Sequence, residues 1–142
     1  MVCVSAVVFG AALTLRAQTP AGPTAKTVWD GIYSEAQAKT GGELYMENCA
    51  DCHGEFLAGL ESAPPLVGSS FLSNWNKTPV RRLFDVVEQM PPDNPKSLTA
   101  KQYLDIVAYL LHANEFPTGK AALENDRSLL GQILITSTAP GQ

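Results

Sequence analysis

The sequence predicts a small all-α domain of three to four helices joined by long loops. Its 142 residues are enough for a single domain of ordinary size. Apolar side chains recur at three- and four-residue steps over residues 83–90 and 103–111, which is the period of a helix with one buried face. Stretches rich in Gly and Pro, without a regular period, separate these helical patterns and predict loops.

Charge and composition set aside several classes of protein. Lys and Arg number 10 against 14 Asp and Glu, so the net charge is -4, whereas a nucleic-acid-binding domain would normally be basic. The hydrophobic fraction of 45% is too high for an intrinsically disordered chain. Three cysteines are too few for a disulfide-rich scaffold, and their odd number leaves at least one with another role. We expect a small acidic globular protein that does not bind nucleic acid.

The N-terminal residues 1–17 are predicted to be a signal peptide. They are apolar and carry no charged side chain before the last two positions, but they are too few to cross a bilayer, which takes about 20 residues. Cleavage after Ala17 would remove Cys3 and leave Cys49 and Cys52 as the two remaining cysteines. We therefore expect an exported, periplasmic protein with no transmembrane segment in the mature chain. A leader kept as an N-terminal membrane anchor is the alternative.

The first half of the mature chain is predicted to contain one helix. Residues 18–33 form an N-terminal extension, rich in Pro and Thr at first and apolar towards its end. A helix is predicted over residues 34–50, because Ser34 and Gln37 form the capping-box pattern of a helix start. Residues 54–76 contain three Gly and two Pro without a helical period, and this composition predicts a loop.

Two further helices are predicted in the second half. Thr78-Pro79 combines an N-cap residue with a proline at the first helical position, which predicts a helix over residues 79–89. A Met-Pro-Pro sequence ends it. Thr99 and Gln102 form a second capping box, and the apolar stripe that follows predicts a helix to about residue 113.

The tail, residues 117–142, is predicted to be a short C-terminal extension. It begins with Pro-Thr-Gly, which favours a turn. A short helix is predicted near residues 126–131, followed by a β-prone run at residues 133–135.

The chemistry of the chain is concentrated in residues 49–53, Cys-Ala-Asp-Cys-His. A Cys-x-x-Cys-His run is the signature of covalent c-type haem attachment. Two thiols at this spacing can add to the two vinyl groups on one edge of a porphyrin, and the adjacent His53 can then bind the iron. A redox dithiol would need a βαβ context, and a zinc site two more ligands, of which the sequence offers only His112. The motif predicts one covalent haem c, held by Cys49, Cys52 and His53.

The second axial ligand of such a haem has three candidates: Met46, Met90 and His112. Met46 lies one turn before Cys49 in the same predicted helix, which ties it to the proximal side and favours a packing role. His112 lies far around its helix from the apolar stripe, so we expect it to face solvent. Met90 lies where a helix stops and a Pro-rich loop begins, from which its thioether can reach iron. We predict His53 and Met90 as the metal ligands, and a thioether ligand raises the reduction potential.

The imidazole of a haem-ligating histidine needs an acceptor for its second nitrogen. A backbone carbonyl in the Pro64-Pro65-Leu66 loop, most simply that of Pro64, is a candidate. The alternative is that these prolines only stiffen the loop.

These residues resemble the class I monohaem cytochromes c of bacteria, over roughly residues 34–116. Beyond the pentapeptide, the resemblance rests on residues of the first helix, the proximal and distal loops and the last helix: Gly41, Tyr45, Pro64, Leu66, Met90, Ile106 and Tyr109. It implies a cytochrome c domain over residues 34–116, folded around one covalently bound haem. It also implies that the last helix crosses Gly41 through Ile106 and Tyr109, that Pro64 and Leu66 belong to the haem-binding loop, and that Met90 is the distal ligand.

Two further features take their meaning from this resemblance. In the family an aromatic side chain often donates to a haem propionate, and Trp75 can do so through its indole N–H; a core tryptophan is the alternative. Lys77, Arg81 and Arg82 form a local basic cluster. It is either part of a docking face near the haem edge or a solvated helix face.

A longer pattern, from Val28-Trp29-Asp30-Gly31 to Phe116-Pro117-x-Gly119, resembles cytochrome domains associated with quinoprotein (PQQ-dependent) dehydrogenases. This resemblance implies redox partner proteins, with a quinoprotein dehydrogenase as electron donor and a terminal oxidase or another cytochrome as acceptor. The acidic balance of the chain suggests a partner with a basic docking surface.

We therefore expect a periplasmic monohaem cytochrome that carries single electrons between partners. No catalytic Ser/His/Asp set, carboxylate pair or phosphate-binding glycine loop is visible in the sequence, so we do not expect an enzyme. One alternative is a tightly bound electron-accepting subunit of a PQQ-dependent dehydrogenase, suggested by the long tail. Another is a five-coordinate haem sensor or ligand-binding protein in which Met90 does not bind the iron.

Overall fold

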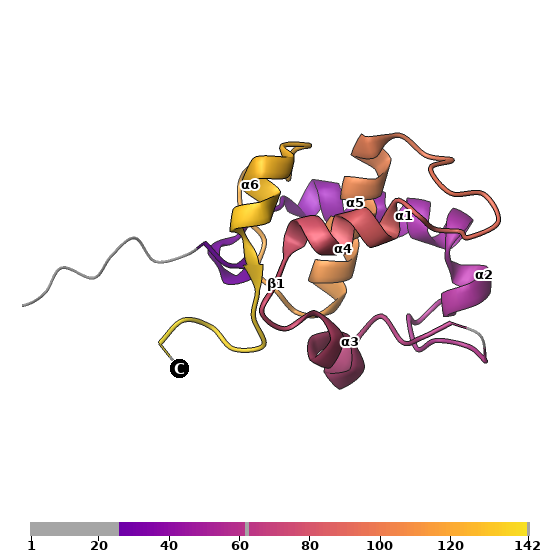
Figure 1. Cartoon of the computed structure of the whole chain (residues 1–142), viewed down its shortest axis with the longest axis horizontal. Coiled ribbons are helices and arrows are strands. Elements are labelled where there is room, and N and C mark those ends of the chain that lie inside the picture. The colour runs from indigo at the N-terminus through magenta and orange to yellow at the C-terminus, as the bar shows by residue number, and fades with distance from the viewer. Residues whose placement is uncertain (1–25, 62, 142) are drawn as a thin grey trace, which may run out of the picture.

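A computed structural model describes residues 26–61 and 63–141 of the chain. The elements of this part are, in order, the 3₁₀ helix η1 (Val28–Asp30), α1 (Glu35–Asn48), α2 (Ala50–His53), α3 (Gly68–Trp75), β1 (Thr78–Pro79), α4 (Val80–Val87), α5 (Ala100–Ala113), α6 (Arg127–Gln132) and β2 (Leu134–Ile135). The predicted all-α class is confirmed (Figure 1). The expected signal peptide, residues 1–17, and the start of the N-terminal extension lie outside the described residues.

The centre of the fold is the contact between α1 and α5, the most extensive between two helices of the described chain. A Cβ atom added to Gly41 would lie 1.8 Å from the backbone oxygen of Asp105 and 3.0 Å from the nitrogen of Ile106. Only glycine permits this approach. The expected crossing of Gly41 by Ile106 is confirmed, but the ring of Tyr109 lies over the neighbouring Gly42, 3.2 Å from an added Cβ.

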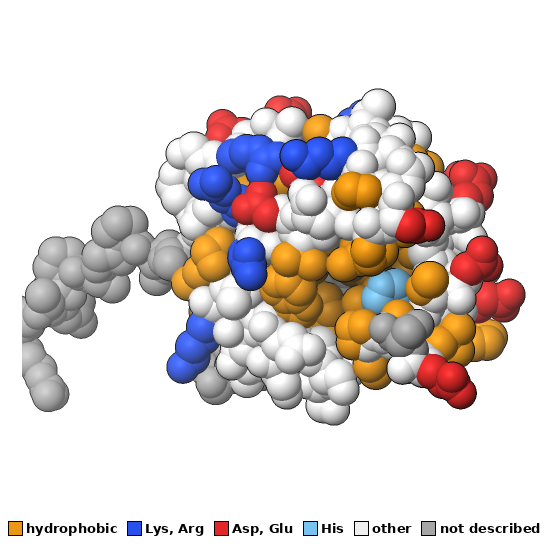
Figure 2. All heavy atoms as spheres, turned by 45° about the vertical axis from the view of Figure 1, so that its right-hand side comes forward, with side chains coloured by type: hydrophobic (Ala, Val, Ile, Leu, Met, Phe, Trp, Pro, Cys, Tyr) orange, Lys and Arg blue, Asp and Glu red, His pale blue; other side chains and the backbone are white. Residues whose placement is uncertain are grey.

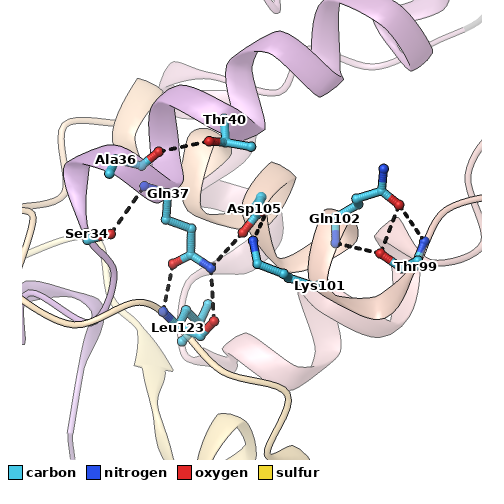
Figure 3. Close-up of polar contacts among 9 residues, drawn as sticks. All are labelled: Ser34, Ala36, Gln37, Thr40, Thr99, Lys101, Gln102, Asp105 and Leu123. Atoms are coloured by element: carbon cyan, nitrogen blue, oxygen red, sulfur yellow. Dashed lines mark hydrogen bonds and ion pairs between the residues drawn. The ribbon is translucent and has the colours of Figure 1, made fainter.

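The N-caps predicted at Ser34 and Thr99 are present, and their capping partners Gln37 and Gln102 use their side chains differently (Figure 3). Thr99 and Gln102 form the complete, reciprocal capping box. Ser34 accepts from the backbone nitrogen of Gln37 at 3.2 Å, but the Gln37 side chain does not return to the cap. Instead its Nε2 donates to Asp105 at 3.0 Å and to the Leu123 carbonyl at 2.9 Å, and its Oε1 accepts from the Leu123 nitrogen at 2.7 Å. Gln37 thus fastens the C-terminal segment to α1 and α5.

The structure corrects two of the predicted elements. Residues 54–76 are not a continuous loop, because α3 forms at their end around the fully buried Phe71 and its neighbour one turn on, Trp75, with ring centroids 6.3 Å apart. The Gly, Ser and Asn residues around this pair mask its helical spacing in the sequence. The helix predicted over 79–89 begins at Val80, and the prediction of Thr78 as its N-cap is wrong. Pro79 is the N-cap, because Thr78 and Pro79 form the strand β1.

The segments on both sides of the expected haem domain pack against it. Trp29 of η1 donates its indole N–H to the Thr136 carbonyl at 2.9 Å, and the buried Tyr33 hydroxyl donates to the carbonyl of Phe116. The predicted β-prone run forms β2, which pairs antiparallel with β1. Within residues 26–61 and 63–141, no helix is both long and apolar enough to cross a membrane.

Candidate haem-binding site

A cavity of about 530 Å³ lies between α2, α4 and α5 and is walled mainly by apolar side chains. Leu83, Val86 and Val87 line it from α4, and Ile106 and Leu110 from α5. Figure 2 shows a hollow bordered by hydrophobic side chains on this face of the molecule. The cavity brings together every residue that the sequence proposed for the site: Cys49, Cys52, His53, Pro64, Leu66, Trp75 and Met90.

The two cysteines are presented by a break between two helices. α1 ends at Asn48, Cys49 has non-helical backbone angles, and the single turn of α2 carries Cys52 and His53. Tyr45, one turn before Cys49, donates its hydroxyl to the Gly54 carbonyl at 2.7 Å and so ties the far end of α2 back to α1. Cys49 is half-buried and Cys52 is exposed, and both are free thiols.

The environment of Cys49 keeps its sulfur uncharged at neutral pH. Burial, and secondarily the neighbouring Cys52, raise the pKa of the Cys49 thiol to about 11. A neutral sulfur is compatible with the apolar walls of the cavity, because an unpaired buried charge would be costly there.

The imidazole of His53 is oriented by the proximal loop. Its Nδ1 lies 3.0 Å from the backbone oxygen of Pro64. With Nδ1–H donating to this carbonyl, Nε2 carries the free lone pair that a metal needs. Of the two interpretations of the proline loop, the structure shows the carbonyl acceptor.

A residue that the sequence reasoning missed holds this loop in place. Asn114, the C-cap of α5, donates through Nδ2 to the carbonyls of Leu66, at 2.9 Å, and Leu110, at 2.8 Å. Its Oδ1 accepts from the Gly68 nitrogen at 3.0 Å. An asparagine just after a helical stripe signals a helix end in the sequence, but nothing there indicates the second segment that it binds.

Met90 lies just beyond the end of α4. Its nitrogen donates to the Val87 carbonyl at 3.0 Å, and its own carbonyl accepts from the hydroxyl of Tyr103 in α5 at 3.0 Å. Tyr103 was predicted only as part of the apolar stripe. The hydroxyl oxygen of Tyr103 is the one indication of this contact in the sequence, since a buried tyrosine hydroxyl usually finds a hydrogen-bond partner.

The other candidate residues lie as follows. Met46 is 47% exposed and does not line the cavity, so the structure does not show the packing role expected for it. His112 is exposed, as expected.

Trp75 is partly buried and packs against the core, as a core tryptophan would. It also lines the cavity wall, where a propionate donor would have to lie. Of the basic cluster Lys77, Arg81 and Arg82, all exposed, Arg81 pairs with Asp85 at 3.6 Å.

The donors around the cavity fit a haem c. The thiols lie one helical turn apart at the rim, an imidazole with an engaged Nδ1 follows them, and a thioether lines the same space. Apolar walls of this kind suit a porphyrin face. Within the part of the chain that the structure describes, no three His, Cys, Asp or Glu side chains gather as a bare metal site would require.

Comparison with known proteins identifies the family. The family model described as cytochrome C oxidase, cbb3-type, subunit III, matches residues 36–110. The curated proteins contain no significant match. Among solved structures, the chain is similar to one in the crystal structure of the sulfane dehydrogenase SoxCD from Paracoccus pantotrophus, with a TM-score of 0.53 and 24% identity over 85% of this chain and 68% of that one. At this identity the likeness shows the fold alone. Because the family model covers just over half of its length, the chain belongs to the cytochrome C oxidase, cbb3-type, subunit III family: it is a bacterial class I monohaem cytochrome c that binds haem c covalently and takes part in electron transfer.

Proposed function

We propose that the protein is a periplasmic carrier that passes single electrons between redox partner proteins, with its iron bound by His53 and Met90. The observation that carries this proposal is the convergence of the Cys-x-x-Cys-His motif and Met90 on one apolar cavity. These residues come from α2 and from the loop after α4, far apart in the sequence.

Each residue of the site has a proposed role. Cys49 and Cys52 form the two thioether bonds, His53 is the proximal ligand and Met90 the distal one. When bound, the haem supplies a one-electron Fe(III)/Fe(II) couple. The Pro64 carbonyl accepts a hydrogen bond from Nδ1–H of His53, and this leaves Nε2 free for the metal. The Tyr103 hydroxyl donates to the Met90 carbonyl and so fixes the backbone at Met90.

The surrounding side chains control access to the site. Leu83, Val87 and Leu110 exclude water from the cavity, which favours the less charged state of a redox centre. Leu66 is proposed to pack against the haem and Trp75 to donate its indole N–H to a propionate. Two protein ligands leave no open position for a substrate, so we propose electron transfer without catalysis at the metal.

The proposed partner has a basic docking surface. Between residues 40 and 76 the chain has five acidic and no basic residues, and this segment contains both cysteines and His53. Figure 2 shows Lys and Arg side chains gathered at the upper left of this face, among some Asp and Glu, whereas the lower right edge carries Asp and Glu alone. Such an asymmetry steers a partner of opposite charge to one end, and redox encounters typically use interfaces below about 1,200 Å². We propose a quinoprotein dehydrogenase as donor and a terminal oxidase or another cytochrome as acceptor.

The test is the spectrum of the purified holoprotein, expressed with a c-type haem maturation system. We expect covalent haem by pyridine haemochrome assay and a far-red charge-transfer band between the methionine sulfur and Fe(III) in the oxidised protein. The Met90→Ala variant should lose the band. A wild-type protein without the band that binds CO rapidly would instead support the five-coordinate sensor and overturn the Met90 assignment.

A second candidate is a fixed electron-transfer subunit of an oxidoreductase complex. The matching family model is itself described as a subunit of an oxidase, which favours this candidate. The tail that first suggested it is, however, used within the chain, where α6 packs on α4. Size-exclusion chromatography of the protein from its native host decides between them. A monomer at both low and high salt supports the carrier, and a large complex that survives high salt supports the subunit.

A further inference from the structure

The C-terminal segment, residues 117–141, fixes the first residues of α4. β2 pairs with β1 directly before α4 begins, in the register Thr78 to Ile135 and Pro79 to Leu134. The nitrogen of Lys77 donates to the Ile135 carbonyl at 2.7 Å, and that of Val80 to the Ile133 carbonyl at 2.9 Å. These bonds hold the N-terminal end of α4 to the tail.

The same segment also fixes the last residues of α4, through Arg127 of α6. The guanidinium donates through Nη1 to Asp85 and through Nη2 to the Oε2 of Glu88, at 2.6 Å. It also lies over the ring of Phe84, 5.0 Å from the ring centroid. A planar guanidinium that binds two carboxylates and an aromatic face holds its partners in a defined geometry, which an isolated surface ion pair does not.

Glu88 connects this contact to the loop that carries Met90. The Glu88 side chain is 13% exposed, and its carbonyl accepts from the Lys96 nitrogen at 2.9 Å, which closes the loop back on the helix end. On the inner face of the same helix, Leu83 and Val87 line the cavity. A displacement of the end of α4 would therefore move both the distal wall of the cavity and Met90.

We propose that the C-terminal segment is a brace for α4, with Arg127 as a positioning residue that keeps the Met90 thioether at the iron. This proposal rests on the proposed assignment of Met90 as distal ligand. It gives the tail, which the minimal haem fold lacks, a role in the strength of axial ligation. A braced Met90 loop resists displacement by an external ligand and keeps the reduction potential high.

The test compares Arg127→Gln with Arg82→Gln in the oxidised holoprotein. Arg82 is exposed on α4 and forms no ion pair with any described residue, so its variant removes the same charge without touching the contact between Arg127 and the end of α4. The probe is imidazole, which competes with the thioether for Fe(III). We expect Arg127→Gln to bind imidazole about fivefold more tightly than wild type, with a weaker far-red band and a lower midpoint potential. Arg82→Gln should match wild type in all three measurements.

Two further variants test the route of the effect. Arg127→Lys keeps the charge but cannot bind both carboxylates in one plane, and should fall between wild type and Arg127→Gln. If the coupling runs through Glu88, the double variant of Arg127→Gln with Glu88→Gln should bind imidazole no more tightly than Arg127→Gln alone.

The outcomes separate the brace from the Met90 assignment. A wild-type protein without the far-red band overturns the Met90 assignment and the brace with it. A wild-type protein with the band, and an Arg127→Gln variant whose imidazole affinity and potential are unchanged, overturns the brace alone. A lowered melting temperature with unchanged imidazole affinity would likewise contradict it, because Arg127 would then only stabilise the fold.

Discussion

The Nδ1 of His53 lies 3.0 Å from the backbone oxygen of Pro64, and this contact joins the haem-attachment helix to the proximal loop. The acceptor is a main-chain atom, so no side-chain substitution at Pro64 removes it directly. The position of the carbonyl depends on whatever holds the loop. In this protein the loop is held by Asn114, whose side chain binds the backbone on both sides of Val67, at Leu66 and Gly68.

We predict that Asn114→Ala lowers the free energy of unfolding of the holoprotein by about 1–3 kcal/mol, because it leaves the Leu66 carbonyl and the Gly68 nitrogen without their partner. Urea denaturation followed by circular dichroism measures the loss. Asn114→Asp is the matched variant: it keeps an acceptor for Gly68 but turns a charged carboxylate oxygen towards the carbonyls of Leu66 and Leu110 at the C-terminal end of α5. It should lose at least as much stability as Asn114→Ala at neutral pH, and a smaller loss would contradict the assignment of bonds.

Gly41 and Gly42 are neighbours that should respond differently to alanine. At Gly41 the new Cβ would meet the Asp105 backbone oxygen at 1.8 Å, so α1 and α5 must separate; we predict a loss of more than about 3 kcal/mol. At Gly42 the Cβ would meet only the ring of Tyr109 at 3.2 Å, and the gain in helix propensity of about 1 kcal/mol offsets the crowding. Yields of holoprotein and urea midpoints of the two variants provide the comparison. Equal effects would contradict the close crossing at Gly41.

Tyr103→Phe removes the hydroxyl that donates to the Met90 carbonyl at 3.0 Å. We expect a loss of about 1 kcal/mol of stability and a weaker far-red band, because the backbone at the proposed ligand is less restrained. Tyr109→Phe is the control, since its ring lies over Gly42 and does not line the cavity. An unchanged band in Tyr103→Phe would show that this bond does not position Met90.

The protein should lose stability in alkaline solution. Burial raises the pKa of Tyr33 and of Tyr45 from 10.0 to about 12 in the folded protein. Between these values the unfolded chain releases protons that the folded chain retains, so the free energy of unfolding is constant below about pH 10 and falls as the pH rises towards 12. Urea midpoints measured over this range test the prediction. Tyr45→Phe should reduce the slope, and an unchanged slope would exclude Tyr45 as a source.

The sequence predicted the attachment motif and the long helices well because both depend on local patterns. Cys49, Cys52 and His53 are adjacent in the chain, and the cap at Thr99 marks its helix unambiguously. The contacts that the sequence did not reveal join distant segments: Gln37 with Leu123, and Arg127 with Glu88. Gln37 was assigned to a local capping box, and only the tertiary fold shows that its amide is used elsewhere.

Two other predictions failed through the same dependence on context. Residues 68–75 are predicted as loop because their Gly, Ser and Asn residues outnumber the two aromatic side chains that anchor α3, the buried Phe71 and the partly buried Trp75. Met46 is expected to have a packing role because it precedes Cys49 by about one turn, yet about half of its surface is exposed. Spacing places a residue on a helix, but the neighbouring elements decide which face of the helix is covered.

The two ends of the described chain meet on one side of the molecule. The nitrogen of Leu134 donates to the Lys26 carbonyl at 2.9 Å, and Trp29 binds Thr136. In Figure 1 this side lies at the opposite end of the long axis from α2. A fusion partner, affinity tag or surface tether that joins the described chain at Lys26 or at its C-terminal end would therefore start on the side opposite the attachment helix and leave that helix accessible. These two positions are suited to immobilisation of the protein on an electrode.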